Sequence, residues 1–125
     1  MPKIYYRKNC SSSRQAVQWF REHNIHFELI SINQLPQKEL LRLLSLTDKG
    51  FATILKRAGK GGKSIEKQIS KLMMMNFNDA VNYLSATPEL IKTPLIVEED
   101  KFFSGYNREE IRQFIPREYR IQTIL

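Results

Sequence analysis

The order of the strand-like and helix-like segments restricts the fold of this chain more than any single motif does. Residues 3–6 are rich in β-branched and aromatic side chains, and apolar residues alternate over 27–32, so both segments are predicted to be strands. Between them, residues 14–23 carry apolar side chains at helical spacing. Two strands joined by a helix are usually parallel neighbours in one sheet. The chain is therefore expected to open with a β-α-β unit.

The middle of the chain is predicted to be helical. Pro36 suits the first turn of a helix that Gly50 is expected to cap at its C-terminal end, and residues 51–57 can form a second, short helix. The glycines between residues 59 and 63 predict a loop, because glycine favours no regular structure. Helical spacing resumes after this loop and continues to about residue 87.

The last third of the chain returns to strands and then to a helix. Residues 95–97 and 101–103 flank an acidic turn, which is the pattern of an antiparallel hairpin. Asn107 followed by Glu110 resembles a capping box, so a helix is expected to begin there and to end at Pro116. This part of the chain is thus expected to form a β-β-α unit.

The complete order predicts an α/β protein of thioredoxin-like fold with a central all-helical insert. We expect the thioredoxin-like part over about residues 1–35 and 88–117, and the insert over about residues 36–87. A length of 125 residues suits one domain. Residues 1–125 are therefore expected to form a single domain.

The positive charge of the chain is concentrated in its central part. The net charge is +7, and residues 49–71 hold seven basic residues and one acidic residue. Lys56, Arg57, Lys60 and Lys63 make up a basic patch in this segment, which suits a polyanion or an acidic protein surface. A solvated helical face is the alternative interpretation.

The composition also limits the sites and the location that we expect. Cys10 is the only cysteine and the chain has two histidines, which are too few to build a zinc site, so we expect neither a metal nor a cofactor. No segment reaches the roughly 20 apolar residues of a membrane span, and residues 1–8 are too charged to begin a signal peptide. We therefore expect a cytoplasmic protein without membrane contact.

Cys10 is the first candidate for chemistry. It lies at a strand-to-helix junction, where helix N–H groups and the helix dipole stabilise a thiolate. Arg7, Lys8 and Arg14 add positive charge nearby, so the pKa of the Cys10 thiol is expected to be lowered. Ser13 stands where a redox dithiol would have its second cysteine; it can donate a hydrogen bond to the sulfur but cannot resolve a mixed disulfide. The alternative is that Cys10 is a small residue used for packing.

Pro94 is the second candidate. It follows Thr93 and precedes the predicted strand over 95–97. In a thioredoxin-like fold this proline is expected in the cis form, facing the cysteine loop at the edge of the sheet. Without the fold, a trans proline in a turn would be the default.

Motifs along nearly the whole chain resemble the arsenate reductase/Spx family. They are Tyr5, Cys10 with Ser13 and Arg14, Leu-Thr-Asp-Lys-Gly at 46–50, Thr-Pro-Leu-Ile-Val at 93–97, and Gly-Tyr-Asn-Arg-Glu-Glu-Ile-Arg-Gln-Phe-Ile-Pro-Arg at 105–117. The last run, together with the Thr-Asp-x-Gly turn, resembles the Spx branch most closely.

The resemblance to the Spx branch implies a regulator of transcription under thiol stress. Such regulators bind the C-terminal domain of the RNA polymerase α subunit, alter promoter choice, and are degraded by the ClpXP protease with an adaptor. A family glycine needed for the α contact matches Gly50, so an α-binding surface is implied at Gly50, Thr47, Lys49 and Tyr5, together with the first predicted helix. Promoter DNA is expected to be contacted only within that complex. The family's redox Cys-x-x-Cys pair is replaced here by Cys-Ser-Ser-Ser.

The same resemblance leaves an enzyme as the alternative function. The run Cys10 to Arg14 also matches the Cys-x-x-Ser-Arg run of single-cysteine arsenate reductases, thiol oxidoreductases that use glutathione or glutaredoxin. Those enzymes carry an arginine directly before the cis-proline, where this chain has Thr93, with Lys92 one step away. Arg57 lies only near the place of a second oxyanion-binding arginine. Because lysine does not replace a bidentate guanidinium, the regulator is the preferred interpretation.

Overall fold

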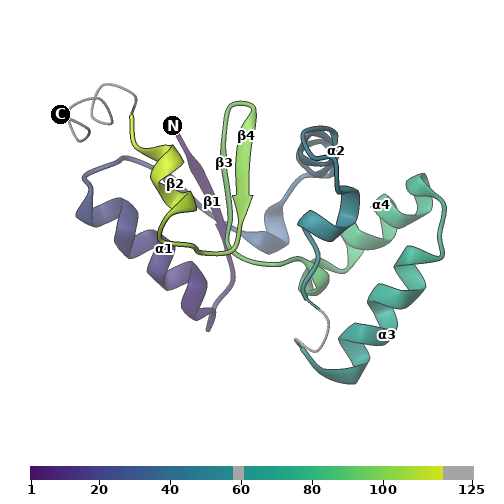
Figure 1. Ribbon diagram of the computed structural model, residues 1–125. Coiled ribbons are helices and arrows are strands. Elements are labelled where there is room, and N and C mark those ends of the chain that lie inside the picture. The colour runs from purple at the N-terminus through teal and green to yellow at the C-terminus, as the bar shows by residue number, and fades with distance from the viewer. Residues whose placement is uncertain (58–60, 117–125) are drawn as a thin grey trace. The chain divides into compact units, whose positions relative to one another are not determined.

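The computed structural model describes residues 1–57 and 61–116, which cluster into two compact units (Figure 1). The first unit comprises Met1–Ile30 and the described residues from Thr93 onward, and the second comprises Ser31–Lys92. Within the described ranges, no helix has both the length and the apolar character needed to span a membrane.

The first unit contains a four-stranded sheet. Its strands are β1 (Lys3–Tyr6), β2 (Glu28–Ser31), β3 (Leu95–Glu98) and β4 (Lys101–Ser104). Their order in the sheet is β2-β1-β3-β4, and β3 is antiparallel to both of its neighbours. The hairpin predicted in the last third of the chain is therefore confirmed as β3 and β4.

Helix α1 (Ser11–Glu22) packs its apolar face against this sheet. Its Ala16 and Phe20 are fully buried and share one core cluster with Ile4 of β1 and Ile96 of β3, which pair across the two strands. Burying a side chain such as Phe20 stabilises the fold by about 1.5–3 kcal/mol. The helical spacing of the apolar residues in the sequence thus corresponds to the face of α1 that the core requires.

The segment after β4 is a 3₁₀-helix (η4, Glu110–Phe114) and not the predicted α-helix. The Asn107 side chain accepts hydrogen bonds from the N–H groups of Glu109 at 2.8 Å and of Glu110 at 3.0 Å, where this helix begins. Its buried residues, Ile111 and Phe114, are three positions apart. This spacing matches the three residues per turn of a 3₁₀-helix, which is commonly adopted in such short segments.

Apart from one isolated antiparallel bridge between Leu55 and Ile91, the regular structure that is described in the second unit is helical. The helices are α2 (Gln37–Ser45), α3 (Gly62–Met73), α4 (Phe77–Ala86), and the 3₁₀-helices η1 (Ile32–Gln34), η2 (Gly50–Thr53) and η3 (Pro88–Leu90). Helix α4 packs against both α2 and α3. Leu40, Leu43 and Leu84 are among the fully buried side chains at these contacts.

The turn after α2 differs from the prediction. Helix α2 ends at Ser45, so Gly50 does not cap it. Gly50 instead begins η2, with a φ of +58°. The helix predicted over residues 51–57 is limited to η2, because the chain then extends to pair Leu55 with Ile91.

The glycine-rich loop predicted over residues 59–63 ends earlier than expected. Gly61 lies directly before α3 with a φ of +87°, and Gly62 and Lys63 already belong to the helix. A Cβ at Gly61 would lie 2.8 Å from Cγ1 of Ile65, so only glycine fits this helix start without a shift. Residues 58–60 of the predicted loop lie outside the described ranges.

Candidate functional site

Cys10 is the N-terminal cap residue of α1, directly after the turn that follows β1. Its backbone is extended, with φ −105° and ψ 112°, and its C=O accepts a hydrogen bond from the N–H of Arg14 at 3.2 Å. The preceding residue, Asn9, has a φ of +61°, a left-handed conformation that asparagine adopts more readily than most residues. The Cys10 thiol is therefore partly exposed at the N-terminal end of the helix.

Hydroxyl and N–H groups surround the sulfur of Cys10. Thr93 Oγ1 donates to Cys10 Sγ at 3.3 Å, and the protonated thiol can donate to the carbonyl oxygen of Thr93 at 3.7 Å. Burial is the largest single influence on the thiol and raises the pKa of Cys10. Hydrogen bonds from the side chains of Ser13 and Thr93, and from the N–H groups of Ser13 and Ser12, together outweigh burial, so the pKa of Cys10 lies below its usual value.

A chain of hydrogen bonds continues from Thr93 to Arg7. Arg7 Nη1 donates to Thr93 Oγ1 at 3.3 Å. Because a guanidinium has no acceptor, the Thr93 oxygen must accept this bond, and its own hydrogen remains available to the sulfur of Cys10. The N–H of Arg7 also donates to Ser13 Oγ at 3.4 Å. Arg7 thus contacts both side chains that donate to the sulfur.

The direction predicted for the Cys10 pKa is confirmed, and so are two of its predicted causes, the N–H groups at the helix start and the hydroxyl of Ser13. The charges of Arg7, Lys8 and Arg14, which were also predicted to lower this pKa, are not among its causes in the structure. The side chains of Lys8 and Arg14 are exposed, so water and salt screen their charges.

Thr93 was named in the sequence beside the candidate Pro94 and as a departure from the family's arginine, but the contact of its side chain with the sulfur of Cys10 was not predicted. The Thr93–Pro94 peptide bond is cis, and both residues are buried. The C=O of Pro94 accepts a hydrogen bond from the N–H of Gly105 at 2.7 Å, just after β4. The Thr93 hydroxyl meets the sulfur of Cys10 across 83 positions of the chain, and a contact of that range leaves no local sequence pattern.

Thr93→Val is expected to raise the pKa of Cys10 and to slow its alkylation by iodoacetamide at neutral pH by about three- to tenfold. Valine keeps the shape of threonine but removes one hydrogen bond to the thiolate. The alkylation rate, measured against pH, reports the change, and Thr93→Ser, which keeps the hydroxyl, should behave like the wild type. An unchanged profile in Thr93→Val would show that the hydroxyl does not stabilise the thiolate.

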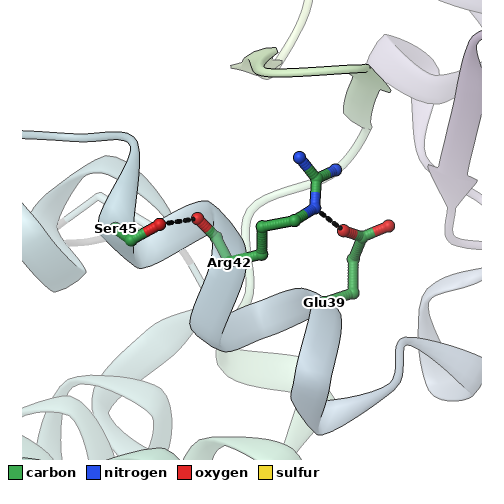
Figure 2. Close-up of polar contacts among 3 residues, drawn as sticks. All are labelled: Glu39, Arg42 and Ser45. Atoms are coloured by element: carbon green, nitrogen blue, oxygen red, sulfur yellow. Dashed lines mark hydrogen bonds and ion pairs between the residues drawn. The ribbon is translucent and has the colours of Figure 1, made fainter.

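The turn that contains Gly50 is the second candidate surface. Helix α2, which leads into it, carries polar contacts among Glu39 in its first turn and Arg42 and Ser45 in its last turn (Figure 2). Arg42 Nε forms an ion pair with Glu39 Oε1 at 2.7 Å, and Ser45 Oγ donates to the C=O of Arg42 at 2.6 Å. Helix α2 therefore reaches the turn with an ordered C-terminal end.

Thr47 orders this turn, and Lys49 is exposed on it. Thr47 Oγ1 is 2.8 Å from Thr53 Oγ1 and accepts a hydrogen bond from the N–H of Lys49 at 3.2 Å. Nothing lies within 4 Å of where a Cβ of Gly50 would be, so a side chain there would point into open space. Tyr5, in contrast, is 1% exposed in β1 of the first unit and contributes to the core instead of a binding surface.

The basic patch gains a member in the structure. Arg57 and Lys63 are exposed and Lys56 is half-buried, while Lys60 lies outside the described ranges. Burial lowers the pKa of Lys92, and the positive charge of Arg57 lowers it further. The positive charges of Lys92 and Arg57 therefore interact, so Lys92 is part of the basic patch, although it was not predicted to be.

Metal binding has no support in the described part of the chain. Among residues 1–57 and 61–116, no three His, Cys, Asp or Glu side chains lie close enough together to hold an ion. The polar groups at Cys10 are hydroxyls, N–H groups and one guanidinium, a set that favours negative charge on the sulfur.

Comparison with known proteins places the chain in a family. The model of the ArsC family matches residues 5–114. Global transcriptional regulator Spx 1 of Oceanobacillus iheyensis is 33% identical over 96% of this chain and 91% of that protein. Global transcriptional regulator Spx of Streptococcus mutans is 29% identical over 99% of this chain and 90% of that protein.

A solved structure shows the same architecture. The crystal structure of an ArsC-family-related protein from Bacteroides fragilis matches with a TM-score of 0.74 and 25% identity, covering 90% of this chain and 97% of that one. The likeness confirms the predicted α/β, thioredoxin-like fold. The chain belongs to the ArsC family, and it is similar to the family's Spx regulators over nearly its whole length.

Proposed function

We propose that this protein is a regulator of transcription that acts with RNA polymerase and binds the C-terminal domain of its α subunit. Relatives named global transcriptional regulator, at 29% and 33% identity over nearly the whole chain, support the regulator. The observation that supports the α contact is Gly50, which lies in a partly exposed turn with a left-handed φ of +58° and open space at its Cβ position. A partner can approach the backbone closely at such a glycine.

The proposed contact surface extends from Gly50 to its neighbours in the turn. Thr47 fixes the turn by hydrogen bonds, and Lys49 adds an exposed positive charge. Leu46, just before the turn, is 38% exposed and supplies apolar surface. A surface with an ordered backbone, a cation and an apolar side chain suits a protein partner, because interfaces combine apolar contact with a polar rim.

Other steps of the proposed function concern DNA, turnover and thiols. Lys56, Arg57 and Lys63 would contact promoter DNA only within the polymerase complex. The protein would act in the cytoplasm. Degradation by the ClpXP protease with an adaptor would limit the amount of the protein. Because Cys10 is the only cysteine and Ser13 cannot resolve a disulfide, no internal switch can form, and oxidants would either leave the activity unchanged or join Cys10 to the thiol of another molecule in a mixed disulfide.

Calorimetry with the purified protein and the isolated α C-terminal domain tests the proposal. We expect a Kd in the micromolar range or tighter, equivalent to about −8 kcal/mol or stronger. Absence of binding would contradict the proposal and favour the single-cysteine oxidoreductase. The same preparation would then be assayed for arsenate reduction with glutathione.

A further inference from the structure

A groove of about 600 Å³ runs along α1 in the first unit, between this helix, the end of β1 and strand β2. Four cationic side chains line it, those of Arg7, Lys8, Arg14 and Arg21. None of the described residues that line it is acidic. Strand β2 is an edge strand of the sheet, and the groove is open to solvent.

The charge of this groove is not a consequence of general basicity. The described residues of the first unit, 1–30 and 93–116, include eight Lys and Arg and seven Asp and Glu, so the unit is nearly neutral. Half of these cations line the groove and none of the acids does. Three of the acids lie together at 98–100, at the end of β3 and in the turn that leads to β4. The fold of this unit therefore gathers positive charge at one place.

Three of the four cations have no counter-charge within the described part of the chain. The side chains of Lys8, Arg14 and Arg21 form no ion pair with any residue in the ranges 1–57 and 61–116. Arg7 differs, because it donates to Thr93. Unpaired cations gathered in one open groove attract anionic groups and raise the rate at which a negatively charged partner associates.

The groove also offers apolar surface between its cations. Arg14, Val17 and Arg21 lie along one side of α1, because they are three and four positions apart, and Val17 is half-buried there and also packs against the core cluster that contains Phe20. Leu29 of β2 lines the groove from the other side and is 43% exposed. A ligand that fills the groove would therefore cover apolar side chains as well as neutralise charge.

The combination of cationic and apolar side chains in the groove distinguishes between classes of ligand. A nucleic-acid backbone or an inorganic anion can neutralise the cations but presents no apolar side chain to Val17 and Leu29. A protein segment that mixes acidic and apolar residues matches both features. We infer that the groove along α1 docks an acidic segment of a partner protein that carries apolar side chains, and that this contact is separate from the one at Gly50.

Fluorescence anisotropy with the full chain tests this docking. The probe is a fluorescein-labelled peptide of about ten residues that alternates glutamate and leucine. The variant Arg14→Glu with Arg21→Glu, both on the exposed face of α1, should weaken binding at least about tenfold. The matched control, Lys63→Glu with Lys67→Glu on α3, changes the net charge equally and should stay within about twofold of the wild type.

Two further comparisons separate docking from general attraction of anions. Leu29→Asn, at an exposed position, and a peptide with serine in place of leucine should each weaken binding about threefold or more. Gly50→Arg should bind the peptide like the wild type, whether or not it binds the α subunit. Equal loss in both charge-reversal variants, or a DNA duplex that displaces the peptide as well as unlabelled peptide does, would overturn the inference.

Discussion

Gly50→Arg is expected to weaken binding to the α C-terminal domain at least about a hundredfold, equivalent to about 2.8 kcal/mol, while the protein stays folded. The arginine side chain would project from the turn into the space that the partner must occupy. Its cost to folding is the left-handed φ of +58°, about 1–2 kcal/mol for a residue with a Cβ. This cost is smaller than the roughly 5–15 kcal/mol of unfolding free energy that small proteins have.

Gly50→Ala is the matched control for this variant. Alanine has the same backbone strain but the smallest side chain, so the two variants differ in bulk and charge alone. Calorimetry should place the alanine variant within about tenfold of the wild type, and urea unfolding should show both variants folded. Unchanged binding by Gly50→Arg would move the α contact away from this turn.

Phe20→Ala is expected to lower the free energy of unfolding by about 3–5 kcal/mol. Phe20 is 0% exposed, and its ring centroid lies 5.2 Å from Trp19, 5.5 Å from Phe27 and 6.0 Å from Phe114. Removing the ring leaves a cavity among these aromatic side chains and loses the contacts between the rings, each worth about 0.5–1.5 kcal/mol. Urea unfolding followed by circular dichroism measures the loss.

Phe77→Ala provides the contrast for this substitution. Phe77 is 53% exposed on α4 and contacts Phe51 at 5.7 Å between ring centroids. Because most of its surface already faces water, its removal should cost no more than about 1 kcal/mol. Similar losses for the two variants would mean that the cluster around Phe20 does not dominate the stability of the chain.

Periodicity predicted those parts of the fold in which one face is buried. The apolar residues of α1 correspond to a single covered face, so their spacing specifies the helix. The β3–β4 hairpin was predicted instead from two apolar runs that flank an acidic turn, and consecutive residues of β3 are buried. The segment 110–114 has the same kind of spacing as α1, yet it forms a 3₁₀-helix because its two core residues are only one turn apart. In so short a segment, the spacing of apolar residues in the sequence does not distinguish an α-helix from a 3₁₀-helix.

The part of the candidate site that is local in sequence was predictable, and the cis form of Pro94 followed from the expected fold, but the side-chain contacts of Thr93 were not predictable. Cys10 and Ser13 lie on one turn of chain, and their pairing follows from the helix start. The hydroxyl of Thr93 and the guanidinium of Arg7 reach each other across 86 positions, so only the folded sheet brings them together. The left-handed conformation of Gly50 likewise depends on how the turn continues into η2 and not on an α2 cap.

Arg7 links two places that have been described apart, since it lines the cationic groove and also donates to Thr93. A carboxylate in the groove that draws its guanidinium away would leave the Thr93 hydroxyl free to turn from the sulfur of Cys10. Coupling between two sites is reciprocal in free energy. If binding in the groove changes the equilibrium for modification of the thiol by some factor, modification of the thiol would change the affinity of the groove for its ligand by the same factor. Arg7 would then couple the oxidation state of Cys10 to the binding of a partner protein.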